Sequence, residues 1–122
     1  MITIPPEKAE RMLIKVLESD EFSSSATCRH LLRYLVESSI KGERPKETAI
    51  AMDVFDKDTD YDPARDSIVR SYMHILRKKL NAYYLSEGRA EKTRFYLPKG
   101  RYEILIRETA PQEKNPYKKA TF

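Results

Sequence analysis

The sequence predicts a mainly α-helical domain that ends in a short β-hairpin. Before residue 86, apolar residues recur every three or four positions in several segments, which is the spacing of amphipathic helices. After Lys92 the period changes to two around a Pro-Lys-Gly turn, which is typical of a hairpin. The length of 122 residues and the hydrophobic content of 40% suit one small domain with a single core.

The first two helices follow from their apolar stripes. Pro5 and Pro6 suit the first turn of a helix. The segment "SDEFSSS", residues 19–25, breaks the first pattern, and Ser24 or Ser25 can cap the second helix. Gly42 ends the second helix as a C-cap. The two predicted core stripes are Ala9, Met12, Leu13, Val16 and Leu17, and then Cys28, Leu31, Leu32, Leu35, Val36 and Ile40.

A third helix is predicted from Pro45 to Phe55, and an acidic loop, "DKDTDYDPARDS", follows it. The loop invites comparison with a calcium loop, because Asp56, Asp58 and Asp60 would occupy ligand positions 1, 3 and 5. However, Tyr61 stands where the template requires glycine, and Ser67 stands where it requires a bidentate glutamate. We therefore expect no metal site here.

The acidic loop also contains two helix-start signals. Asp62-Pro63 is an N-cap followed by a first-turn proline, so it is expected to start a turn, and Asp66-Ser67 can cap the next helix. That helix is predicted from about Asp66 to Leu85, and Ser86 and Gly88 terminate it. Its apolar stripe is Val69, Tyr72, Met73, Leu76, Leu80 and Tyr83.

The hairpin is predicted in "TRFYLPKGRYEILI", residues 93–106, with its turn near Pro98 to Arg101. Three core helices followed by a two-stranded hairpin form a winged helix-turn-helix. We therefore expect a winged-helix domain over residues 1–107, with one additional N-terminal helix. Residues 108–122 show no periodicity and contain two prolines, so we expect a disordered tail.

Charge is distributed unevenly along the chain. Residues 1–64 contain nine Lys and Arg against thirteen Asp and Glu, whereas residues 65–122 contain fourteen against six. A basic half suggests a polyanion as partner, with nucleic acid first, although a solvated face that keeps the protein soluble gives the same pattern.

One face of the long helix carries the side chains suited to reading DNA: Arg70, His74, Arg77, Lys78 and Asn81. In a major groove, arginine pairs with guanine, asparagine reads adenine, and lysine holds phosphate. The hairpin adds basic residues at the second place where a winged helix contacts DNA, namely Lys92, Arg94, Lys99 and Arg101. Together these elements predict binding to double-stranded DNA.

No arrangement of residues supports catalysis, a cofactor or a zinc site. Cys28 lies on a core stripe, and one Cys with His30 and His74 is too few ligands for zinc. The three glycines form no phosphate loop, and Lys46-Glu47 has the character of ordinary helix-surface charge. We also expect no membrane span and no secretory signal, and therefore a cytoplasmic protein.

Two segments, "IVRSYMHILRKKL" (68–80) and "FYLPKGRYEI" (95–104), resemble the recognition helix and wing of OmpR-type effector domains of bacterial response regulators. The order "VLESDEF", "RHLLRYLVE", "AIAMDVFD" and "YDPARDSIVR" is most similar to a bacterial subgroup at the N-terminus of repeat-containing signalling proteins. The resemblance covers about residues 9–107. The chain departs from the response-regulator domains in starting with a helix instead of a four-stranded sheet. It also departs from the subgroup at Arg101, where glycine is frequent, and at Ser67, where proline is frequent.

The resemblance implies a role for several residues. It places Arg70, His74 and Arg77 on the groove-facing side of the recognition helix and Lys99 at a wing tip that reaches the minor groove. It places Ser24 and Ser25 where a DNA phosphate could sit. It also makes loop 56–66 a candidate surface for RNA polymerase.

We therefore expect a bacterial transcription regulator, with the helix at about 66–85 in the major groove and the wing at 93–107 on the backbone or the minor groove. Such modules commonly act as dimers, and the first helix is a candidate homodimer surface. The alternative is a winged-helix module that binds a protein, without DNA, through the acidic loop. An enzyme is the third hypothesis, and no constellation supports it.

Overall fold

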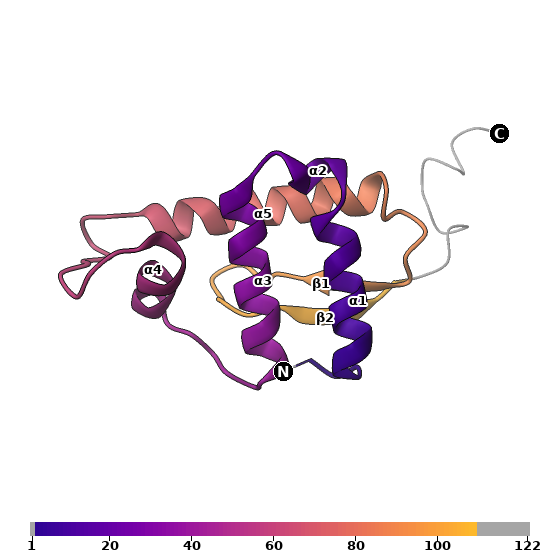
Figure 1. Ribbon diagram of the computed structural model, residues 1–122, viewed down its shortest axis with the longest axis horizontal. Helices are drawn as coiled ribbons and strands as arrows, with labels where there is room; N and C mark the ends of the chain where they lie inside the picture. Colours follow the sequence, from indigo (N-terminus) through magenta and orange to yellow (C-terminus); the bar gives the residue numbers. More distant parts are fainter. Residues whose placement is uncertain (1, 110–122) are drawn as a thin grey trace.

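The computed structural model describes residues 2–109, in which five helices precede two strands (Figure 1). The helices are α1 (Pro6–Leu17), α2 (Asp20–Ser23), α3 (Ala26–Ile40), α4 (Glu47–Phe55) and α5 (Ile68–Leu85), and the strands are β1 (Thr93–Tyr96) and β2 (Leu105–Glu108). This confirms the predicted mainly α-helical class with a terminal hairpin.

The helix boundaries at α1 and α3 follow the predicted signals. Pro6 is the first residue of α1. Ser25 is the N-cap of α3, and its hydroxyl accepts a hydrogen bond from the main-chain N–H of Cys28 at 3.2 Å. Gly42 follows the end of α3 with a φ of 75°, a left-handed conformation that glycine adopts without a steric penalty.

The break expected at residues 19–25 instead contains the short helix α2. The side chain of Phe22 in α2 is completely buried, and α2 contacts α1, α3 and α5. Burial of one large aromatic therefore holds this segment against the core, although the segment contains too few apolar residues to show helical periodicity.

One predicted helix start was displaced: α4 begins at Glu47, two residues after Pro45. α5 begins at Ile68, directly after the predicted cap Asp66-Ser67, and the Asp66 carboxylate accepts a hydrogen bond from the Ile68 N–H at 3.0 Å. Ser67 occupies the N-cap position, and its side chain makes no capping hydrogen bond.

The core lies between the α1–α3 pair and a second layer formed by α5 and the hairpin. α1 and α3 run side by side across α5 and the two strands (Figure 1). α4 contacts α3 and α5, and the acidic loop projects beyond it at one end of the molecule (Figure 1). All five helices and the segment before β2 contribute large, completely enclosed side chains, which include Leu13, Phe22, Leu31, Leu32, Leu35, Ile50, Leu76 and Ile104.

The predicted apolar stripes form this core. Every residue of the α1 stripe is buried, as are all residues of the α3 and α5 stripes except Ile40 and Tyr72, which are half-buried. Because helical periodicity reports which face avoids water, the sequence is informative about the core.

The hairpin is antiparallel, with Thr93 opposite Glu108 and Tyr96 opposite Leu105. β2 begins later than expected, because the chain before it turns to α3: the N–H of Ile104 donates to the buried hydroxyl of Ser39 at 3.1 Å. Glu108 belongs to β2, and the N–H of Thr109 donates to the Lys92 carbonyl at 2.7 Å, so the prediction that the tail starts at residue 108 was wrong for these two residues. The remainder of the predicted tail, residues 110–122, lies outside the described residues.

Candidate nucleic-acid interface

The solvent face of α5 is the first part of the candidate interface. The buried stripe of α5 packs on the core, which leaves the opposite side of the helix exposed. On this exposed side stand three of the predicted residues, His74, Lys78 and Asn81. None of the three has a side-chain hydrogen bond or ion pair to any other residue in the range 2–109. They are therefore available to an external ligand.

Arg70, also predicted to face a DNA groove, is engaged inside the protein. Its guanidinium donates to the Glu47 carboxylate at 2.6 Å and to the Pro63 carbonyl at 2.7 Å. Arg70 thus joins α5 to the start of α4 and to the acidic loop. About half of its side chain, 46%, remains exposed.

Glu47 is the centre of this arrangement, and the expectation that it is ordinary surface charge was wrong. Only 14% of its side chain is exposed. Besides Arg70, its carboxylate lies 2.7 Å from the phenol oxygen of Tyr102 and 2.9 Å from that of Tyr61. Burial raises the pKa of Glu47, but the hydrogen bonds from Tyr102 and Tyr61, with the charge and hydrogen bond of Arg70, outweigh burial and hold this pKa below its ordinary value.

The two tyrosines at Glu47 respond in the opposite direction. Burial, together with the hydrogen bond to Glu47, raises the pKa of Tyr61 to about 12, and the same two causes raise the pKa of Tyr102. Both phenols therefore remain neutral donors at physiological pH. Because Tyr61 belongs to the acidic loop and Tyr102 to the hairpin, one carboxylate positions both elements relative to α5.

Arg77 fastens the middle of α5 to the hairpin. Its Nε donates to the Leu97 carbonyl at 3.0 Å, and its Nη2 donates to the Pro98 carbonyl at 3.2 Å. Two turns further along the helix, the phenol of Tyr84 accepts a hydrogen bond from the N–H of Phe95 at 2.9 Å. Side chains of α5 thus satisfy polar groups of the hairpin backbone.

The basic residues at the hairpin turn differ in whether they have a partner within the protein. Lys99 is exposed at the turn, where Gly100 has a φ of 75°. Arg101 is paired with Glu103, a buried carboxylate that Arg44 also approaches at 3.3 Å. The charge of Arg101 is therefore partly neutralised within the hairpin, whereas Lys99 has no partner in residues 2–109.

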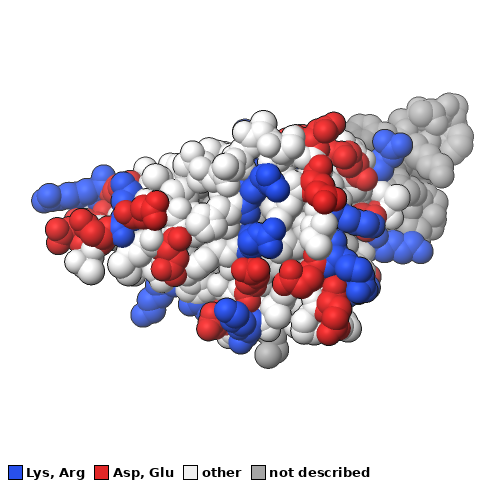
Figure 2. Space-filling model, viewed as in Figure 1, with Lys and Arg blue, Asp and Glu red and all other residues white. Residues whose placement is uncertain are grey.

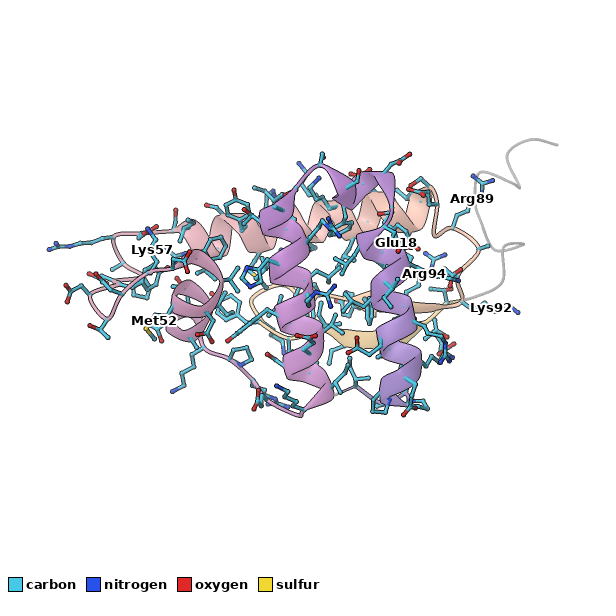
Figure 3. The ribbon with its side chains drawn as sticks, in the orientation of Figure 1. Glu18, Met52, Lys57, Arg89, Lys92 and Arg94 are labelled. Carbon is cyan, nitrogen blue, oxygen red and sulfur yellow. The ribbon has the colours of Figure 1, made fainter. Side chains whose placement is uncertain are left out.

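Arg94 lies at the far end of the hairpin from the turn. Its guanidinium donates to the carbonyls of Glu91 and Arg89, at 2.8 Å and 3.0 Å, and stacks 5.1 Å from the ring centroid of Tyr84. Figure 3 shows Arg89, Lys92 and Arg94 at the end of the molecule opposite to Lys57 of the acidic loop. Arg94 thus holds the connection between α5 and β1.

Ser24 and Ser25 lie between α2 and α3. The hydroxyl of Ser25 is occupied by the capping bond to Cys28, and Ser24 is exposed at the end of α2. Lys79 ties α5 to this region by donating to the Glu21 carbonyl at 2.9 Å. The Ser25 side chain therefore serves the helix, whereas that of Ser24 faces solvent.

The acidic loop is ordered by its own carboxylates. Asp58 accepts from the N–H of Asp60 at 2.9 Å, and Asp62 accepts from the N–H of Ala64 at 3.0 Å. The second bond confirms the turn expected at Asp62-Pro63. These aspartates serve the backbone of the loop, and residues 2–109 contain no group of three or more His, Cys, Asp or Glu side chains arranged to hold a metal ion.

The α1–α3 side of the molecule does not form a continuous basic surface. Figure 2 shows acidic and basic side chains interspersed on this side. This mixture suits a solvated surface and offers little attraction to a polyanion.

Residues that the sequence did not indicate complete the interface. Tyr96 and Arg107 stand on the outer side of the hairpin, and the Arg107 guanidinium lies 3.7 Å from the centroid of the Tyr96 ring. Period-two spacing places them on the face opposite the buried Phe95, but it could not show that this face adjoins α5.

No protein-family model matches the chain, and neither a curated protein nor a solved structure matches it. Across residues 2–109, none of the helices combines the length and the apolar character needed to cross a bilayer.

Proposed function

We propose that this protein is a winged-helix domain that binds double-stranded DNA in a sequence-specific manner and acts as a bacterial transcription regulator in the cytoplasm. In this proposal α3, α4 and α5 are the three core helices, α5 is the recognition helix, and the β1–β2 hairpin is the wing. The helix order, the length of α5 and the position of the hairpin beside it support this assignment.

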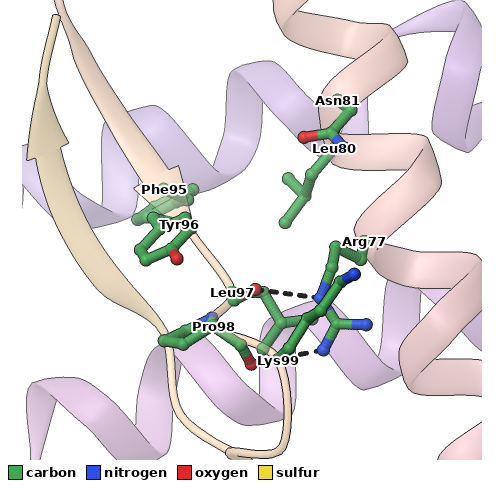
Figure 4. Close-up of a pocket in the computed structure, with 8 residues that line it drawn as sticks. All are labelled: Arg77, Leu80, Asn81, Phe95, Tyr96, Leu97, Pro98 and Lys99. Atoms are coloured by element: carbon green, nitrogen blue, oxygen red, sulfur yellow. Dashed lines mark hydrogen bonds between the residues drawn. The ribbon is translucent and has the colours of Figure 1, made fainter.

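One observation carries the proposal: the exposed, unengaged polar side chains of α5 and of the hairpin turn lie beside one another. His74, Lys78 and Asn81 project from α5, and Lys99 projects from the turn that Arg77 fastens to α5. Asn81 and Lys99 line the same groove (Figure 4). A helix offering asparagine and lysine next to a basic loop is suited to base edges and phosphates together.

The residues of α5 have two kinds of role in this proposal. His74, Lys78 and Asn81 contact DNA directly. Arg70 and Arg77 act chiefly by holding α4, the acidic loop and the wing against α5, because their guanidinium groups already donate within the protein. Loss of either arginine is still expected to weaken specific binding, by roughly 1–3 kcal/mol, since the wing and helix would no longer be held in register.

The decisive experiment measures binding to mixed-sequence duplex DNA by fluorescence anisotropy at about 50 mM and 200 mM salt. We expect affinity to fall steeply between these concentrations, because lysine and arginine displace condensed counterions. Absence of binding at about 50 mM salt contradicts the proposal. Selection of bound duplexes from a random pool would then identify the target sequence.

The second candidate is a protein-binding module, and the acidic loop is the observation that favours it. The loop is held by Tyr61, whose hydroxyl lies 2.9 Å from the Asp66 carbonyl, and it projects beyond α4 (Figure 1). An acidic surface next to a DNA-binding helix is repelled by DNA, so it is suited to a protein such as RNA polymerase. Binding of a protein partner that survives loss of the exposed α5 side chains, with no DNA binding, would favour this candidate.

A further inference from the structure

A groove runs between α5 and β1, and we call it the helix–hairpin groove. Its first hollow has a volume of about 440 Å³ and is lined in part by Arg77, Asn81, Tyr96 and Lys99 (Figure 4). A second hollow of about 320 Å³, nearer the open end of the hairpin, shares Asn81 and Tyr96 with the first and adds Arg107. The two hollows together run along the hairpin from its turn toward its open end, on the face that carries Tyr96 and Arg107.

The charge of the helix–hairpin groove has one sign. Arg77 and Lys99 line the first hollow, and Arg94 and Arg107 line the second, whereas neither hollow is lined by an aspartate or glutamate of residues 2–109. Such a lining repels cations and favours an extended anion.

Two side chains of the groove, Tyr96 and Arg107, have hydrogen-bond donors that no group of residues 2–109 accepts. The sequence did not indicate either residue. The hydroxyl of Tyr96 has no hydrogen-bond partner in residues 2–109. Arg107 is exposed and has no carboxylate partner there, and its guanidinium is stacked on the Tyr96 ring at 3.7 Å. Stacking fixes the plane of the guanidinium while leaving its N–H groups free, so less conformational entropy is lost when it binds an anion.

The place of this groove determines which anion fits. A helix in the major groove of a duplex and a wing in the neighbouring minor groove are separated by one sugar-phosphate strand. That strand must cross the space between the helix and the wing. In this protein the helix–hairpin groove occupies that space.

We propose that the helix–hairpin groove holds the phosphodiester backbone of one DNA strand, with Arg107 and the Tyr96 hydroxyl as donors to its phosphates. This inference rests on the proposed function and adds two residues to it. Asn81 then stands at the boundary between base contacts and backbone contacts. Because phosphates carry no sequence information, Arg107 and Tyr96 contribute affinity and no specificity.

The test compares Arg107→Ala and Tyr96→Phe with the wild-type protein on a selected duplex and on two unrelated duplexes. We expect Arg107→Ala to weaken binding roughly tenfold on all three and to reduce the slope of log affinity against log salt by about one. Tyr96→Phe keeps the ring beneath Arg107 and should weaken binding about threefold on all three. Thermal melts of both variants check that the fold is retained.

Two controls isolate the groove. Arg11→Ala removes an exposed arginine of α1 that has no partner in residues 2–109, and it should leave affinity and salt slope unchanged. Arg107→Lys keeps the charge and should retain the wild-type salt slope. Duplexes in which single phosphates are replaced by neutral methylphosphonates locate the contact. Replacement of the phosphate that Arg107 contacts should weaken binding of the wild-type protein and leave the affinity of Arg107→Ala unchanged.

The outcomes separate this inference from the proposed function. If Arg107→Ala and Tyr96→Phe bind like the wild type while Lys78→Ala weakens binding, the backbone assignment is overturned and DNA binding stands. If either variant changes the preference between duplexes, its assignment to the backbone is overturned. If the wild-type protein binds no duplex, both proposals fail, whether or not the groove binds an acidic peptide instead.

Discussion

The carboxylate of Glu47 accepts a hydrogen bond from the phenol of Tyr102 at 2.7 Å, across 55 positions of sequence. Arg70 and Tyr61 reach the same carboxylate, so α4, α5, the acidic loop and the hairpin meet at one side chain. A largely enclosed anion with donors on several elements fixes their relative positions, because removing it leaves several polar groups unsatisfied together.

Glu47→Gln should therefore destabilise the protein. Glutamine retains the size of the side chain but removes the charge, and it cannot accept all three hydrogen bonds. We expect the free energy of unfolding in urea to fall by about 1–3 kcal/mol. Glu18→Gln, an exposed position without a partner in residues 2–109, is the matched control and should change little. Equal losses in the two variants would contradict the role of Glu47.

The free energy of unfolding should also decrease at acidic pH because Glu47 becomes protonated. Because its pKa in the folded protein lies below the ordinary value of 4.5, the folded state favours the ionised form. The resulting stabilisation is fully present above the ordinary pKa and is lost as the pH falls through the folded value. In urea titrations between pH 7 and pH 3, wild-type stability should therefore drop more than that of Glu47→Gln. Parallel curves would show that this carboxylate does not contribute.

Arg77→Ala and Lys78→Ala provide an adjacent pair with different expected effects. Arg77 holds the Leu97 and Pro98 carbonyls, whereas Lys78 points to solvent. Arg77→Ala should lower the free energy of unfolding by roughly 1 kcal/mol and should also weaken DNA binding. Lys78→Ala should weaken DNA binding with unchanged stability. Urea denaturation and anisotropy on the same samples distinguish the two, and a stability loss in Lys78→Ala would argue against its free position.

Two glycines should resist substitution for different reasons. A Cβ at Gly88 would collide with the ring of Tyr83, so Gly88→Ala should cost about 1–3 kcal/mol by overpacking. Gly100 has open space around it but a φ of 75°, so Gly100→Ala should cost about 1 kcal/mol through backbone strain. Thermal or urea melts measure both losses. Gly100→Asn should recover part of its loss, since asparagine tolerates this conformation, whereas Gly88→Asn should be at least as damaging as alanine.

Asp58→Ala tests the acidic loop. Its carboxylate accepts one local bond from Asp60 and is exposed to solvent. We expect duplex binding to be unchanged or slightly tighter in anisotropy titrations, because one repulsive charge is removed. A loss of affinity comparable to that of Lys78→Ala would show that the loop itself contacts DNA.

The sequence was most informative about positions whose local pattern is set by burial. The apolar stripes of α1, α3 and α5 became core faces, and the cap at Ser25 and the left-handed Gly42 appear where their residue types require. The pattern was least informative at α2, where burial of Phe22 alone decides the conformation.

For the candidate site, the sequence identified basic residues on α5 and the hairpin but could not assign their partners. Arg70, Arg77 and Lys78 share one helix and one sign of charge, and the sequence does not show that Arg70 and Arg77 bind acceptors within the protein whereas Lys78 does not. Glu47 showed no sequence signal that separates it from an exposed glutamate, because its three donors come from three distant segments.

The sequence by itself determined four of the five helices of residues 2–109, the hairpin and the apolar faces of α1, α3 and α5, since helical and strand periodicity record which side of each element avoids water. Only the tertiary structure decided which polar side chains are occupied and which are free. Glu47 and Arg77 connect elements within the protein, and Lys78, Asn81, Tyr96 and Arg107 remain available at its surface. The physical reason is that a hydrogen bond between remote segments depends on distances of about 3 Å, which arise only after the elements have packed.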